Sequence, residues 1–171
     1  APVVWLVTGD VTIAGTVDLN GAGSVVAPNL AEPGAGGFRG GMGYYGPNSA
    51  GSAGFGPGGG ARQDRGYGAA HSNTPTDSDA PTYGNPSLLP LVGGSGGGGD
   101  RDSTSNGGGA GGGALLVATP GTLTLSGTIQ ANGGAGAADR YNVGNRTGGG
   151  SGGGIRLVCS SLVSPGTGKI E

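Results

Sequence analysis

The 171-residue chain is poor in the features on which disulfide frameworks and membrane insertion depend. Cys159 is its single cysteine, so an internal disulfide is excluded, and we interpret this residue as small, inert and buried. The longest apolar runs, residues 3–7 and 114–118, are far too short to cross a bilayer. We therefore expect neither a disulfide framework nor insertion into a membrane.

Charge is also scarce, because eight Lys and Arg stand against ten Asp and Glu, with a net charge of −2. The basic residues form no cluster that could neutralise a run of phosphates, so no nucleic-acid partner is expected. With 46 glycines and 11 prolines the composition approaches that of a disordered chain, but disorder usually comes with high net charge. The few large apolar residues are concentrated in repeated segments. This predicts one folded domain, residues 1–171, that relies heavily on backbone hydrogen bonds.

A repeated segment organises the chain. Residues 3–21 align without a gap on residues 115–133, and a degenerate third copy covers residues 155–171. In this third copy, residues 152–160 align on residues 111–119. A long insert rich in glycine and tyrosine, residues 22–113, separates the first two copies. Repetition of this kind is typical of a stacked architecture.

Each copy has the pattern of short strands. In the second copy Leu123, Leu125 and Ile129 alternate with threonines, and the first copy alternates in the same way. A period of two with β-branched residues predicts half-buried strands, whereas the continuous apolar runs before them suit strands covered on both faces. No stretch has helical periodicity. The sequence therefore predicts an all-β chain without helices.

Glycine tracts are the second structural element. Residues 93–99, 107–113 and 148–154 share a length, and their only interruptions are Ser or Ala. Flexible linkers would explain the composition. Extended polyglycine helices packed side by side would also explain why two tracts lead directly into strands. The combined prediction is a short-strand β-solenoid or sandwich-like sheet with packed tracts that resemble polyglycine II.

Two resemblances support this reading. The frame at residues 123–134, followed by the frame at residues 148–158, resembles glycine-rich repeats of large secreted bacterial surface proteins, which are read as β-solenoid-like. Glycine tracts that alternate with variable polar loops also look like the polyglycine-sandwich adhesins at the tips of phage tail fibres. Both resemblances imply extracellular, non-enzymatic roles. The long insert between the first two copies departs from a regular solenoid.

Catalytic motifs are weak. Residues 93–97 and 149–153 match G-x-S-x-G, but this pattern needs a following helix, a histidine and an acid. His71 is the only histidine, and we interpret it as a solvated loop residue. The dinucleotide pattern G-x-G-x-x-G lacks its βαβ unit. We therefore expect no enzyme, no catalytic residue and no cofactor.

Calcium is the one metal considered, because hard oxygen ligands cluster in two loops. The weak candidates are Asp77, Asp79, Asp100 and Asp102. Neither loop has the glycine at the sixth place or the glutamate at the twelfth place of a calcium-loop signature. The sequence therefore gives calcium only as a remote cofactor.

Tyrosines in the polar loops are the candidate recognition residues. Loops rich in Tyr, Ser, Gly and Asn on a rigid frame are typical of adaptable binding surfaces. The alternative is that these tyrosines only cover glycine surface on ordinary connections. The candidates are Tyr44, Tyr45, Tyr67, Tyr83 and Tyr141.

The two ends of the chain predict self-assembly. An apolar strand opens the chain, and the last repeat stops at Ile170 and Glu171, before the equivalent of residues 131–133. An open sheet edge must be covered or paired, so we expect the first strand of one copy to complete the last repeat of another. Truncation is the alternative explanation, and the missing initiator Met indicates a removed N-terminal segment. The predicted interface comprises Val3, Val4, Trp5, Leu6, Val7 and Ile170.

The expected function is therefore a non-enzymatic extracellular structural subunit that forms a surface fibre or layer from copies of itself. An adhesin that recognises a cell surface or a glycan through its tyrosine-rich loops is the alternative. An ice-binding protein on a polyglycine bundle is a remote third reading, because no regular Thr-x-Thr ladder runs through the tracts.

Overall fold

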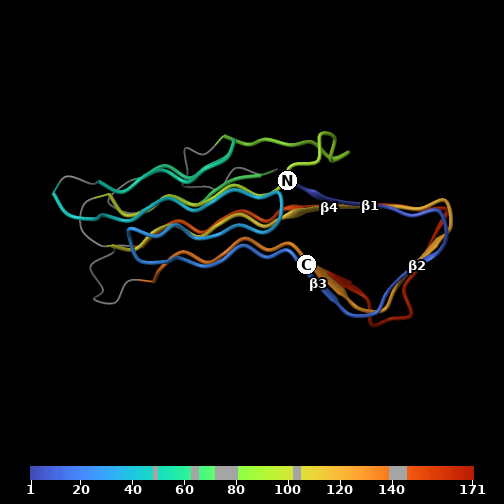
Figure 1. The fold of residues 1–171 in the computed structure, drawn as a ribbon. Helices are drawn as coiled ribbons and strands as arrows, with labels where there is room; N and C mark the ends of the chain where they lie inside the picture. The colour runs from blue at the N-terminus through green and yellow to red at the C-terminus, as the bar shows by residue number, and fades with distance from the viewer. Residues whose placement is uncertain (48–49, 63–65, 72–80, 102–104, 139–145) are drawn as a thin grey trace.

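The computed structural model describes residues 1–47, 50–62, 66–71, 81–101, 105–138 and 146–171. Its strands form three stacked rungs, one for each repeat copy, and glycine-rich segments extend from them as an elongated bundle (Figure 1). The described residues contain no helix, so the all-β prediction is confirmed. The first rung comprises β1 (Val3–Leu6), β2 (Val11–Ile13) and β3 (Thr16–Asp18). The second rung comprises β4 (Ala114–Ala118), β5 (Thr122–Leu125) and β6 (Thr128–Gln130). The third rung comprises β7 (Gly154–Val158), β8 (Ser161–Val163) and β9 (Lys169–Ile170).

Equivalent strands of the three rungs pair in parallel, which gives three sheets of three strands each. The second rung lies in the middle, so β4 has β1 on one side and β7 on the other. Between the first two rungs the register is the one that the sequence alignment predicts: Trp5 pairs with Val117, and Val17 pairs with Ile129. Seen along the stack, the sheets lie on different sides of a triangle that is open towards the glycine bundle (Figure 1).

The predicted register of the third copy is wrong by one residue at its start. Ile155 pairs with Leu115 and Leu157 with Val117, not with Ala114 and Leu116. A one-residue slip turns every side chain of a strand to its opposite face. The observed register turns Ile155 and Leu157 inward, where both pack against the core. Cys159 likewise follows the residue that pairs with Ala118, and it is partly buried instead of fully buried.

The core lies inside the middle rung. One inward face from each sheet supplies it, and these side chains are between 0 and 6% exposed in the middle rung and at Ile13 and Leu19 of the first. Burying a Leu or Ile side chain contributes about 1.5–3 kcal/mol, so this small cluster carries most of the apolar stabilisation. The middle-rung members are Leu115, Val117, Leu123, Leu125, Ile129 and Ala131.

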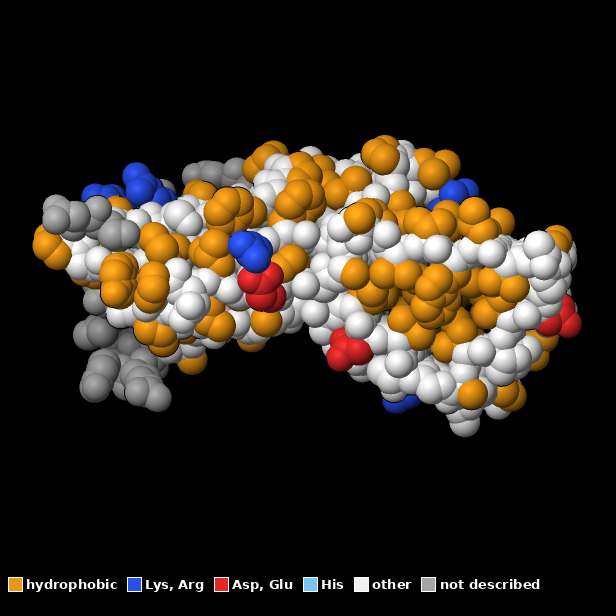
Figure 2. Space-filling model, in the orientation of Figure 1, with side chains coloured by type: hydrophobic (Ala, Val, Ile, Leu, Met, Phe, Trp, Pro, Cys, Tyr) orange, Lys and Arg blue, Asp and Glu red, His pale blue; other side chains and the backbone are white. Residues whose placement is uncertain are grey.

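The outer rungs lack that cover. Exposed fractions are 51% for Val4 and 75% for Leu6 in β1, and 54% for Leu162 in β8. The sequence prediction that this apolar run of β1 is covered on both faces is wrong, because nothing among the described residues stacks beyond it. Hydrophobic side chains gather over the triangle of strands on the face seen in Figure 2.

The glycine segments lie side by side and bond laterally through their backbones. Residues 93–99 and 107–113 are fully buried, whereas residues 148–154 lie nearer the surface. The N–H of Gly97 donates to Gly109, that of Gly109 to Gly148, and that of Gly148 to Gly98, each at 2.9 Å. An equivalent set of bonds joins the same three tracts three residues away, at Gly94, Gly112 and Ser151. This spacing matches the three residues per turn of an extended polyglycine helix.

Close packing explains why these residues are glycine. A Cβ at Gly109, Gly111 or Gly150 would lie closer than 3.0 Å to a carbonyl oxygen of a neighbouring tract. Only a chain without side chains allows backbones to approach this closely. The contacts are those that packed tracts require and that flexible linkers would lack.

Candidate functional sites

The first rung presents an open sheet edge. The N–H of Val7 donates to the carbonyl of Ala118 at 3.0 Å, so this residue bonds toward the middle rung. Alternate residues of a strand direct their backbone groups to opposite sides. Val4 and Leu6 therefore point their N–H and C=O away from β4. No strand of the described residues lies on that side.

The third rung presents the complementary edge. The carbonyl of Val158 accepts the N–H of Thr119 at 2.9 Å, and the N–H of Gly154 donates to Gly113 at 3.1 Å. The even-numbered residues of β7 thus bond toward β4. By the same alternation, Ile155 and Leu157 direct their backbone groups outward. The two ends of the stack therefore expose unpaired strands with the same direction and the same alternation.

The predicted interface residues divide between these two ends. In the first rung Trp5 is 39% and Val7 37% exposed, while Val3 is half-buried against the core. Ile170 lies at the other end, on β9, and is 52% exposed. Sequence reasoning missed Ile155, Leu157, Val158 and Leu162, which belong to the same end as Ile170, because it placed the third copy out of register.

A ladder of polar side chains runs up one corner of the stack. The Asn20 amide donates to Gln130 at 3.0 Å, and the Gln130 amide donates to the carboxylate of Glu171 at 3.0 Å. The Asn20 side-chain oxygen also accepts the N–H of Asn132 at 2.8 Å. Each rung contributes one member, so the ladder reinforces the register of the third sheet.

The described tyrosines differ in their exposure. Tyr45 is exposed, whereas Tyr44, Tyr67 and Tyr83 are half-buried, and Tyr141 lies outside the described residues. Tyr83 donates its hydroxyl proton to the carbonyl of Gly93 at 2.6 Å, which ties it to a buried glycine tract. Burial raises the pKa of the Tyr83 hydroxyl, and contacts with serines of the tracts partly offset this rise.

Only one of the four calcium candidates lies among the described residues. Asp77, Asp79 and Asp102 lie outside the described residues, and Asp100 is fully buried. Within the described residues, no three or more His, Cys, Asp or Glu side chains come together as a metal site would require. Calcium stays a prediction.

The serines of the two G-x-S-x-G matches have structural partners. The Ser95 hydroxyl is fully buried and accepts the N–H of Gly58 at 3.0 Å. The Ser151 hydroxyl accepts the N–H of Ser95 at 2.9 Å. Both side chains therefore bond inside the glycine bundle.

Comparison with known proteins gives no relative: no family, no curated protein and no solved structure matches this chain. In the part of the chain that the structure describes, no helix is long and apolar enough to span a membrane.

One feature that the sequence reading overlooked is a cavity beside His71. The histidine is not a solvated loop residue: its ring packs edge to face against Tyr83, with centroids 4.6 Å apart. The spacing of these residues carries no motif, so only the three-dimensional fold brings them together.

Proposed function

We propose that this protein is a structural subunit that assembles head to tail, with the first rung of one copy stacked on the third rung of the next. The observation that carries the proposal is the pair of open, parallel sheet edges at the two ends of the same stack. Because the two edges lie at opposite ends of the stack and the contact continues the same parallel stacking, it does not close on itself and generates a filament.

The backbone groups match in the register that continues the repeat. If Leu6 of a second copy pairs with Val158, its N–H meets the outward carbonyl of Leu157. Its own carbonyl then meets the outward N–H of Cys159. This is the pairing that β1 and β4 already make within one chain, repeated once more. Parallel stacking thus supplies the missing hydrogen bonds without a change in strand geometry.

Apolar burial supports the same contact. Trp5 of a second copy would lie over Leu157, and Val17 over Ile170, as their equivalents do within the chain. At about 25 cal/mol per Å² of buried apolar surface, covering both ends gives the association a hydrophobic driving force. It would also remove the exposed edges that make unpaired strands prone to aggregation.

Charged side chains at the two ends of the stack have opposing effects on this contact. Lys169 and Arg156 lie on the third rung, and Asp10 and Asp18 on the first, so the two ends carry partly complementary charge. The in-register contact would also place Asp18 opposite Glu171, and like charges directly opposite are destabilising by a few tenths of a kcal/mol or more. Raised salt should therefore weaken association only slightly.

A secreted fibre or surface layer is the setting we propose for this assembly. The resemblance of the repeats to secreted bacterial surface proteins supports this location. Detecting the protein on intact cells with an antibody, without permeabilisation, tests it. Labelling only after permeabilisation would contradict an extracellular role.

A cysteine variant tests the stacking and its register together. In the proposed contact Val7 of one copy lies opposite Cys159 of the next, in adjacent strands about 4.8 Å apart. This spacing falls within the range that a disulfide can bridge. Oxidised Val7→Cys should therefore form a ladder of covalent multimers on a non-reducing gel. Thr8→Cys, shifted by one residue to the opposite face, is the matched control and should not.

A second variant removes the contact. Leu6→Pro deletes an N–H that points to the open edge, while Val7 keeps its bond to the middle rung. We expect Leu6→Pro to stay folded and monomeric in sedimentation experiments while the natural chain forms filaments. A natural chain that stays monomeric at millimolar concentration, or a Thr8→Cys ladder as strong as that of Val7→Cys, would overturn the proposal.

A further inference from the structure

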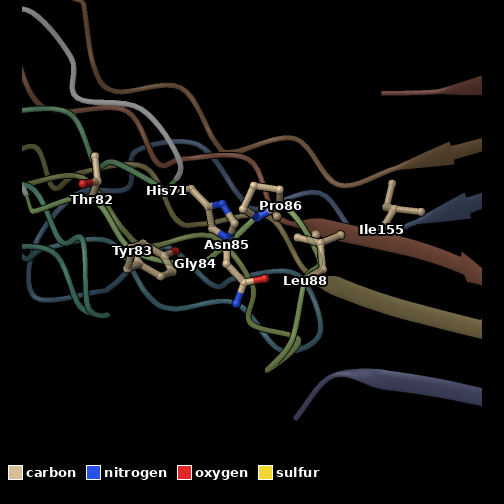
Figure 3. A pocket seen from close by; sticks show the side chains of 10 residues that line it. His71, Thr82, Tyr83, Gly84, Asn85, Pro86, Leu88 and Ile155 are labelled. Atoms are coloured by element: carbon tan, nitrogen blue, oxygen red, sulfur yellow. The ribbon is translucent and has the colours of Figure 1, made fainter.

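A cavity of about 530 Å³ lies where the glycine bundle meets the third rung. This is within the range of small-ligand sites, roughly 300–1,000 Å³. One side comes from the segment that leads into β7, and the other from His71 and the loop at residues 82–88 (Figure 3). Its lining comprises His71, Thr82, Tyr83, Gly84, Asn85, Pro86, Leu88, Gly153, Gly154 and Ile155.

The aromatic part of the cavity is held in place. The N–H of Tyr83 donates to the carbonyl of His71 at 2.7 Å, and the Tyr83 hydroxyl is anchored on Gly93. The His71 Nε2 lies 3.4 Å from the carbonyl of Val92, which favours the tautomer with its proton on Nε2. In this tautomer Nδ1 is a hydrogen-bond acceptor. Gly84 allows the close approach, because a Cβ there would lie 3.1 Å from His71 Cε1.

The loop that forms the apolar part is also ordered by its own bonds. The Asn85 amide donates to the carbonyl of Leu89, and its side-chain oxygen accepts the Ser87 hydroxyl. The N–H of Leu88 closes a turn on the carbonyl of Asn85 at 3.0 Å. Leu88 has a φ of 51°, a left-handed conformation that is uncommon for a non-glycine residue and tends to occur at ligand sites. The turn presents Leu88 to the cavity, near Ile155 (Figure 3).

Among the described residues, the rim of the cavity is polar but uncharged. Asp, Glu, Lys and Arg are all missing from the described lining residues. No hydrogen bond within the described residues engages the Thr82 hydroxyl or the backbone N–H and C=O of Gly84. The cavity thus combines an aromatic pair, an aliphatic wall and a few neutral polar groups.

We propose that this cavity binds a neutral pyranose sugar. A pyranose ring has an apolar C–H face and a rim of hydroxyls, and both are matched: the C–H face by the Tyr83, Leu88 and Ile155 side chains, the hydroxyls by His71 Nδ1 and the Thr82–Gly84 rim. The described lining residues include no Lys or Arg, which disfavours acidic sugars, whose carboxylate would be desolvated without a partner. Ile155 belongs to both regions, because its side chain lines the cavity while its backbone groups face the stacking edge, so sugar binding is also measured on a chain that cannot assemble.

Saturation-transfer NMR on the full chain tests the site. The probes are the methyl glycosides of glucose, galactose and mannose, with glucuronic acid as the charged counterpart of glucose. At least one neutral glycoside should receive saturation and bind at least tenfold more tightly than glucuronic acid. His71→Ala should weaken this binding at least tenfold, and Gly84→Val should abolish it by driving a side chain into His71. Tyr45→Ala, an exposed aromatic outside the lining, is the matched control and should bind as the natural chain does.

Thr82→Val is the variant least expected to disturb folding, because Thr82 is exposed and its hydroxyl makes no hydrogen bond within the described residues. It should weaken binding by a few fold with an unchanged circular dichroism spectrum. Binding of none of the neutral glycosides, equal binding of glucuronic acid, or binding that His71→Ala and Thr82→Val leave unchanged would each overturn the proposal. The assembly-blocked Leu6→Pro variant should bind the sugar normally, so failure of one proposal does not decide the other.

Discussion

In the solenoid the interior is filled by side chains, whereas in the glycine bundle it is filled by backbone. The inward residues Leu115, Leu123 and Ile129 are fully buried and touch one another. The tract at residues 107–113 is equally buried but contributes almost no side-chain atoms. The solenoid therefore depends on apolar surface removed from water, and the bundle on hydrogen bonds between closely spaced chains.

Because of this difference, the solenoid and the bundle tolerate different kinds of substitution. A side chain in the solenoid core can be trimmed, with a cost proportional to the atoms lost. A backbone in the bundle cannot be enlarged, because the neighbouring carbonyl oxygens already occupy the space. The following predictions test this contrast, from the largest expected effect to the smallest.

Adding a side chain inside the bundle should unfold the protein. Gly109→Val and Gly150→Val each place a Cβ within 3.0 Å of a backbone oxygen, of Gly134 and Ala110 respectively. Each should cost more than about 4 kcal/mol, measured by thermal and denaturant unfolding. Gly15→Val, where nothing lies within 4 Å, is the control and should cost less than about 1 kcal/mol. Natural melting behaviour of both bundle variants would show that the tracts act as linkers.

Removing a side chain from the middle rung should cost less than enlarging the bundle. Leu123→Ala creates a cavity at a position that is 0% exposed, so we expect a loss of about 2–5 kcal/mol. Leu162→Ala makes the same change one rung away, at a position 54% exposed. In the isolated monomer it should cost under about 1 kcal/mol. Equal losses in chemical denaturation would mean that the third rung is already covered.

Breaking the polar ladder should have a moderate effect. Asn20→Ala removes the bonds to Gln130 and Asn132, which together are worth roughly 1–2 kcal/mol. Asn29→Ala is the matched control, because its side chain is exposed and makes no bond within the described residues. The difference in stability would be measured from the urea concentrations at the unfolding midpoints, provided that the slope of the unfolding free energy against urea is unchanged. If Asn20→Ala and Asn29→Ala have the same urea midpoint, the ladder does not stabilise the register of the third sheet.

The smallest predicted effect is a loss of stability at high pH. The folded state raises the pKa of Tyr83 above 10, its ordinary value, so folding favours the neutral hydroxyl. Stability from this group is complete below pH 10 and is lost as the pH rises through the raised pKa. Tyr83→Phe should be less stable at neutral pH, because the bond to Gly93 is gone, but should show a shallower decline above pH 10. Identical slopes for the two proteins would contradict this assignment.

The sequence pattern predicted more of the solenoid than of the glycine bundle or the cavity. The offset between the first two copies gave the correct partners for β1, β2 and β3, because their inward and outward residues alternate without interruption. The third copy misled because its glycine run matches its counterpart best at a position one residue away from the observed register. Only the need to turn Ile155 and Leu157 inward separates these registers.

The bundle and the cavity were harder to foresee for different reasons. A glycine tract has no side-chain pattern, so its neighbours cannot be read from its sequence; matched lengths were the only signal. The cavity joins His71, Leu88 and Ile155 from three distant parts of the chain. It depends on a left-handed residue at position 88 that no turn motif indicates.

The number of neighbours of the central glycine tract has a mechanical consequence. Strands of the solenoid bond only to the rungs on either side, so these bonds resist separation along one direction, the axis of the stack. The tract at residues 107–113 instead bonds to segments around its whole circumference: residues 93–99, 148–154, 19–25, 38–41 and 134. A load applied from any side is therefore shared among several backbones. Under tension, the solenoid should part between rungs before the bundle yields.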